Sequence, residues 1–165
     1  GGPIDGLLAL EATVGRAPDP LLRLAALLPG DGAERAESLR LSRAERAALE
    51  ALAPPWTDLG QDVAAWRRSL HRLGPEVFAR RALLAATAGE ADMLAARLGA
   101  AADWRPRQLP LKGRDLIALG AHAGPEIGAL IAALESYWIA CDFAPDRATL
   151  LAEAKGRLDA EKARE

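Results

Sequence analysis

Apolar residues recur every three or four positions along most of the chain, and this spacing places them on one face of an α-helix. Two clear runs are Leu21, Leu24, Ala25 and Leu28, and then Val63, Trp66, Leu70 and Leu73. No stretch alternates with the period of two that a half-buried strand requires. The pattern therefore predicts an all-α protein, a multi-helix array of short antiparallel helices with no sheet.

Capping residues, prolines and glycines divide the pattern into separate helices. Asp19-Pro20 joins a capping side chain to a proline, which lacks the N–H that the first turn would leave unpaired. Ser42 and Glu45 form a capping box, in which each side chain bonds the other's free backbone N–H. These signals predict helices at about 6–14, 20–28, 33–39, 43–53, 58–73, 75–88, 90–104, 114–119, 125–141 and 146–160.

The composition is typical of one helical domain. The chain has 165 residues, half of them hydrophobic and only 4% aromatic, and much of the apolar content is Ala and Leu. Helices accept these two residues at least cost. A chain of this length supports one core better than two, so we expect a single helical domain over residues 1–165.

Charge and motifs exclude several classes of function. Acidic residues outnumber basic ones by 23 to 21, so a polyanionic partner would have to be met by local clusters. The single cysteine, Cys141, excludes an internal disulfide, and two histidines make a zinc cluster hard to assemble. Motifs for phosphate-binding loops, nucleophile elbows and metal ligands are absent, so we expect no catalytic and no metal-binding residues. No apolar run is long enough to cross a bilayer, which predicts a cytoplasmic protein without a membrane partner.

The first of two basic clusters lies between Trp66 and Arg81. It combines His71 and one acidic residue, Glu76, with five arginines: Arg67, Arg68, Arg72, Arg80 and Arg81. Arg68 and Arg72 are four positions apart and therefore project from one side of a helix. Two interpretations stay open, an RNA-facing surface and a solvated face whose arginine stems cover apolar neighbours.

The second basic cluster begins in a loop and ends at a helix start. Pro106 and Pro110 keep the segment 105–112 out of a helix, and its basic residues are Arg105, Arg107 and Lys112. Farther on, Gly124-Pro125 opens a helix whose free N–H groups, approached without a Cβ in the way, can bind a phosphate. We expect Lys112, Arg114 and His122 to surround Gly124. The alternative is that Gly120 is only a left-handed cap and Gly124-Pro125 only a helix start.

The segment that follows the second cluster's loop carries a family resemblance. Its specific parts are Leu-Pro-Leu-Lys-Gly-Arg-Asp-Leu at 109–116, Leu-Gly at 119–120, Gly-Pro-Glu-Ile-Gly at 124–128 and Leu-Glu-x-x-Trp at 134–138. The segments 20–28, 39–42 and 73–74 follow the same order. The chain resembles, over nearly its whole length, the C-terminal region of bacterial CCA-adding enzymes, the tRNA nucleotidyltransferases related to poly(A) polymerases.

The resemblance implies a helical body and tail that bind the acceptor and TΨC arms of tRNA. In that family a separate N-terminal head binds Mg and CTP or ATP, and its Gly-Ser motif and paired aspartates are not in this chain. The implied role is therefore the RNA-holding part of the enzyme, with tRNA and the N-terminal catalytic domain as partners, no cofactor of its own and no catalysis by itself. Two alternatives stay open: the equivalent part of a poly(A) polymerase, and a helical scaffold or dimerisation domain that forms a homodimer.

Overall fold

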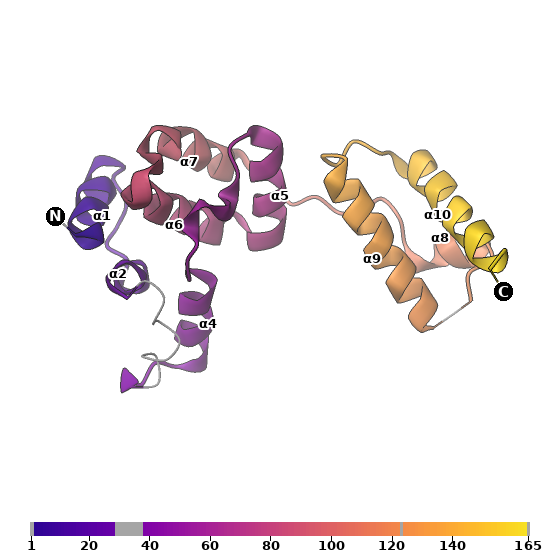
Figure 1. Cartoon of the computed structure of the whole chain (residues 1–165), viewed down its shortest axis with the longest axis horizontal. Coiled ribbons are helices and arrows are strands. Elements are labelled where there is room, and N and C mark those ends of the chain that lie inside the picture. The colour runs from indigo at the N-terminus through magenta and orange to yellow at the C-terminus, as the bar shows by residue number, and fades with distance from the viewer. Residues whose placement is uncertain (1, 29–37, 123, 165) are drawn as a thin grey trace. The chain divides into compact units, whose positions relative to one another are not determined.

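The structure is a computed structural model that describes residues 2–28, 38–122 and 124–164. Within these ranges every regular element is helical and no strand occurs, which confirms the predicted all-α, multi-helix fold (Figure 1). Most of the helix predicted at 33–39 lies outside the described residues. In the described parts of the chain, no helix is both long enough and apolar enough to span a bilayer.

The chain divides into two compact units, Gly1–Arg105 and Pro106–Glu165, where the sequence predicted one domain. The division falls in the loop that contains Pro106 and Pro110, because neither proline can continue the preceding helix. The buried apolar cluster that runs from Leu7 to Ala101 belongs entirely to the first unit. The second unit has buried residues of its own, so each unit has a separate hydrophobic core.

The first unit is built from six α-helices and three short turns among its described residues. Its elements are α1 (Pro3–Thr13), α2 (Pro20–Leu27), α4 (Arg43–Ala51), the 3-10 helix η1 (Trp56–Leu59), α5 (Val63–Leu73), α6 (Pro75–Ala85), the π-turn η2 (Ala86–Glu90), the 3-10 turn η3 (Ala91–Met93) and α7 (Leu94–Asp103). Helix α6 packs against α1, α2, α5 and α7 and is the centre of the unit (Figure 1).

Local capping signals explain where these helices begin. The Asp19 side chain accepts a hydrogen bond from the Leu22 amide at 3.1 Å. The Ser42 amide donates to Glu45 at 2.7 Å, and the Glu45 amide donates back to the Ser42 hydroxyl at 3.3 Å, so the predicted capping box is confirmed. Gly74 lies between α5 and α6 with φ of 77°, which also agrees with the prediction.

Helix α5 begins at Val63 rather than near residue 58, because the chain turns sharply at Gly60. Gly60 has φ of 89°, and a Cβ there would lie 2.3 Å from the Cβ of Ala65, so only glycine fits. The Gly60 carbonyl accepts a hydrogen bond from the Trp66 indole at 2.9 Å. Residues 56–59 therefore form a separate 3-10 helix, which the hydrophobic pattern merged with α5.

A fully buried arginine in α7 is a feature that the sequence pattern did not reveal. The Arg97 side chain is 0% exposed, and its Nη1 lies 2.6 Å from Glu90 Oε2. Its Nη2 donates to the Gly60 carbonyl at 2.8 Å, and its guanidinium carbon lies 5.9 Å from the Trp66 ring centroid. These contacts join α7, η2, α5 and the turn at Gly60, so Arg97 acts as a polar core residue.

The second unit is a three-helix unit. Its helices are α8 (Gly113–Ala118), α9 (Pro125–Ala140) and α10 (Arg147–Lys162), and each of them contacts the other two. Their shared core consists of Leu111, Leu116, Ala121, Leu134, Trp138, Phe143, Leu150, Ala154 and Leu158. The predicted boundaries of the helices at 125–141 and 146–160 agree with α9 and α10 to within two residues.

We expect Arg97→Met to lower the free energy of unfolding of the first unit by about 3 kcal/mol, because it leaves the Glu90 carboxylate without its buried partner. Urea unfolding followed by tryptophan fluorescence measures this loss. The double variant Arg97→Met/Glu90→Gln should recover part of the stability, whereas Arg43→Ala, at an exposed site, should change it by about 0.5 kcal/mol or less. A loss below about 1 kcal/mol for Arg97→Met would contradict this role.

Candidate nucleic-acid interface

Helix α5 presents the arginines of the first basic cluster on the face that points away from its core contacts. The buried positions of α5 are Trp66, Ser69 and Leu70. Arg67 and Arg68 are half-buried, and Arg72 is exposed. The Arg72 guanidinium lies 3.6 Å from Asp58 Oδ2, a long and solvent-exposed ion pair that contributes little to stability. Arg68 and Arg72 therefore lie on an accessible cationic face of α5.

Arg81 does not belong to this face. Its side chain is buried, and Nη1 donates to the carbonyls of Ala51 at 3.0 Å and Ala53 at 2.9 Å. Nη2 donates to the Pro55 carbonyl and, at 2.8 Å, to Asp58 Oδ1. Arg81 therefore satisfies the carbonyl groups of the segment that follows α4, and its charge is used inside the unit.

Arg80 is likewise held by carboxylates within the first unit. Its Nε lies 2.8 Å from Asp19 Oδ2 and 3.4 Å from Glu76 Oε1. Arg16 adds a second partner for Glu76 at 2.6 Å. Glu76 is the one acidic residue of this cluster along the chain, but folding also brings Asp19 beside Arg80 and Asp58 beside Arg81. The accessible cluster is reduced to the cations of α5.

The basic loop divides its arginines between the two units. Arg105 ends the first unit, is exposed, and donates through Nη1 to the Trp104 carbonyl at 3.0 Å. Arg107 belongs to the second unit and is also exposed. Its guanidinium carbon lies 5.1 Å from the centroid of the Phe143 ring, within the range of a cation–π contact. The segment between α7 and α8 is not helical, as predicted.

A group of exposed cations gathers where α8 begins. Lys112 and Arg114 are exposed, and neither side chain has an ion pair among the described residues. The next residue is Asp115, whose Oδ2 accepts the Lys112 amide at 2.8 Å and whose Oδ1 accepts Arg147 Nη2 at 2.7 Å. Arg147 comes from the first turn of α10, and sequence reasoning missed it because its contact with Asp115 spans 32 positions.

Gly124 starts α9, as predicted. Its φ of 128° is a conformation that L-residues rarely adopt, it is exposed, and apart from its chain neighbours no described residue has an atom within 4 Å of the position that a Cβ would take. The backbone there is therefore open to a ligand. Both the structural alternative and the phosphate-binding interpretation predict this geometry, so the side chains around Gly124 must distinguish them.

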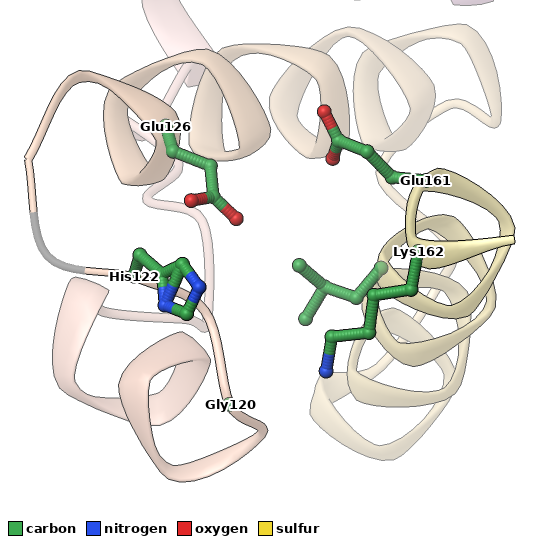
Figure 2. A pocket seen from close by; sticks show the side chains of 6 residues that line it. Gly120, His122, Glu126, Glu161 and Lys162 are labelled. Atoms are coloured by element: carbon green, nitrogen blue, oxygen red, sulfur yellow. The ribbon is translucent and has the colours of Figure 1, made fainter. Parts of the chain in front are cut away.

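The neighbouring cavity, of about 140 Å³, contains both signs of charge. Figure 2 shows His122, which follows α8, and Glu126, from the first turn of α9, on one side, and Glu161 and Lys162, from the end of α10, on the other. Two carboxylates thus face one ammonium group and an imidazole. Glu126 stands in the first turn of α9, where it complements the helix dipole in the way that a bound phosphate would.

The structure does not gather all the predicted residues at this helix start. His122 lines the cavity, but Lys112 and Arg114 are not among its lining residues. They lie at the other end of α8, a helix of six residues and about 9 Å in length, from the turn at Gly120. The cationic site of the second unit is therefore centred on the start of α8, with Arg147, rather than on Gly124.

The accessible side chains of these two surfaces are mainly cationic. Exposed guanidinium and ammonium groups bind phosphate oxygens by charge-assisted hydrogen bonds. Among the described residues, no group of three or more His, Cys, Asp or Glu side chains is arranged to hold a metal ion. Comparison of the chain with protein-family models, curated proteins and solved structures found no match.

The carboxyl group of Asp115 offers a direct test of the α8 site. Its pKa lies below the ordinary value, first because of the Lys112 backbone hydrogen bond and then because of the Arg147 side chain. Since folding lowers this pKa, the group stabilises the fold at neutral pH, and this contribution is lost as the pH falls below about 4. We expect Arg147→Gln to raise the pKa of Asp115 only part of the way, because the Lys112 amide remains.

Carboxyl-detected NMR titration measures this change. Glu45, whose pKa is lowered by its hydrogen bonds with Ser42, is the internal control and should titrate identically in both proteins. An unchanged Asp115 titration in Arg147→Gln would show that Arg147 does not lie beside α8 in solution.

Proposed function

We propose that this chain is an RNA-binding domain: the tRNA-binding C-terminal part of a CCA-adding tRNA nucleotidyltransferase, which holds the RNA backbone while a separate catalytic domain transfers nucleotides. The observation that supports it most is the group of cations at the start of α8. Lys112, Arg114 and Arg147 contribute three positive charges there, and Arg147 is paired with the carboxylate of Asp115. Such a local excess binds phosphates even on a chain that is acidic overall.

The cations of α5 support the same proposal from the first unit. Arg68 is partly exposed and Arg72 is exposed, and among the described residues the only ion pair that either of them forms is the long one between Arg72 and Asp58. Each unit thus has accessible cations of its own, and phosphate contacts by such cations do not depend on base sequence. We therefore infer recognition of backbone and shape, which is the usual way in which proteins bind double-stranded RNA.

The choice of tRNA as the RNA, and the acceptor and TΨC arms as its bound parts, comes from the resemblance of residues 109–138 to CCA-adding enzymes. Under this proposal Mg and CTP or ATP belong to the separate head domain, which also decides between CCA addition and poly(A) addition. A tRNA partner would place the protein in the cytoplasm.

Fluorescence anisotropy with labelled tRNA at two salt concentrations tests the proposal. We expect binding at about 50 mM salt that weakens roughly tenfold or more at about 200 mM, because each phosphate contact releases a counterion. Absence of binding at low salt, or binding that salt does not change, would contradict it. Sedimentation without RNA tests the alternative: a dimer that does not bind tRNA would instead support a scaffold or dimerisation domain.

The double variant Lys112→Gln/Arg114→Gln should weaken tRNA binding about tenfold or more at low salt. The slope of log Kd against log salt should also become less steep, by the amount that the loss of about two phosphate contacts produces. Both side chains are exposed, so the helical content and thermal stability should not change. The matched control Lys155→Gln/Arg164→Gln removes the same charge from exposed positions of α10 and the turn after it. Equal losses in the two variants would show that only net charge matters and that the start of α8 is not the site.

A further inference from the structure

The turn between α9 and α10 contains two consecutive non-glycine residues in the left-handed conformation. Asp142 has φ of 52° and Phe143 has φ of 62°. A bulky aromatic residue rarely adopts this conformation, because its Cβ crowds the backbone. Such strain persists only where surrounding contacts compensate for it. The contacts of Phe143 therefore identify the interactions that stabilise this turn.

On one side, Phe143 packs into the core of the second unit. Its amide donates to the Trp138 carbonyl at 2.9 Å, and its ring meets the Trp138 ring edge to face, with centroids 5.0 Å apart and an interplanar angle of 88°. Both rings are buried. A nucleic-acid base cannot stack on either ring while they are covered in this way, so the aromatic pair is not itself the binding surface.

The exposed group at this place is the guanidinium of Arg107, whose central carbon lies 5.1 Å from the Phe143 centroid. Arg107 comes from the loop 106–112, which contains no acidic residue. The ring attracts the guanidinium through its negative face and restricts the long side chain to fewer conformations. The loop thus presents one exposed arginine whose guanidinium lies against a buried ring.

We propose that Phe143 is a positioning residue that holds the Arg107 guanidinium for a bidentate contact with an RNA phosphate, so that this position requires arginine rather than lysine. The inference rests on the proposed function and specifies one of its contacts. A guanidinium has a planar fork of donors that matches two phosphate oxygens, whereas an ammonium group is a point charge without this fork. A guanidinium that the ring has already ordered also loses less conformational entropy on binding.

Two substitutions that preserve charge test this inference in the full chain with labelled tRNA. Arg107→Lys keeps the charge but loses the fork, and Phe143→Leu keeps an apolar core residue but loses the ring face. We expect each to weaken binding roughly five- to tenfold while the slope of log Kd against log salt stays as in the wild type. Arg107→Gln should weaken binding and should also make this slope less steep, by the amount that the loss of about one phosphate contact produces.

The double variant Arg107→Lys/Phe143→Leu distinguishes positioning from two separate effects. Because both changes act on one contact, the tRNA affinity of the double variant should be about that of whichever single variant binds more weakly. If the two effects were independent, the fold losses in affinity of the single variants would multiply. Arg164→Lys is the matched control: Arg164 is exposed and lies outside both cationic groups, so this change should leave affinity unchanged.

The outcomes separate this inference from the function on which it rests. Wild-type binding that depends on salt, together with unchanged affinity in Arg107→Lys and Phe143→Leu, would overturn the positioning role and leave the proposed function intact. Absence of wild-type binding would overturn both. If Phe143→Leu lowers helical content, Arg107→Lys still tests the inference, because Arg107 is exposed and its replacement does not open the core.

Discussion

Pro106 and Pro110 prevent the helical pattern from continuing between α7 and α8, and the rest of the architecture depends on this break. A helix that ran on past Asp103 would carry the basic loop on its surface as an ordinary solvated stripe. Instead the chain forms two units with separate cores, and the cations are divided between them. Any binding surface is therefore built first within each unit: on α5 in one, and at the start of α8 in the other.

Whether an arginine is structural or remains accessible depends on whether folding places a carboxylate or backbone carbonyl groups beside its guanidinium. Arg97 and Arg81 are buried, and their terminal nitrogens are held by carboxylate and carbonyl oxygens, although the Nε of each has no hydrogen-bond partner among the described residues. Arg80 is held by Asp19 and Glu76. Buried guanidinium groups need such partners because water no longer solvates them. These three residues are structural, although their sequence neighbourhood is as basic as that of Arg68. A count of basic residues along the chain therefore overestimates the cations available to a polyanion.

The second unit shows how a small helical core can order a binding surface. Leu116, Leu134 and Leu150 are fully buried at the junction of its three helices. That packing brings the first turn of α10 to α8, so that Arg147 joins the residues around Asp115, and it brings Phe143 beneath Arg107. The same packing places two carboxylates beside the start of α9, which is why Gly124 is open in its backbone but not cationic in its surroundings (Figure 2).

The sequence by itself determined the all-α class and most helix boundaries, because caps act within four residues of one another: Asp19 with Leu22, Ser42 with Glu45, and the glycine at Gly124. It could also mark the cations of 105–114, since this stretch itself contains no acidic residue. Tertiary structure alone decided which arginines are buried, where α5 begins, that Arg147 contacts Asp115 and that Arg107 lies over Phe143. Each of these contacts joins residues that are distant in sequence or depends on the exact path of a turn, and a hydrophobic period contains no information about such pairs.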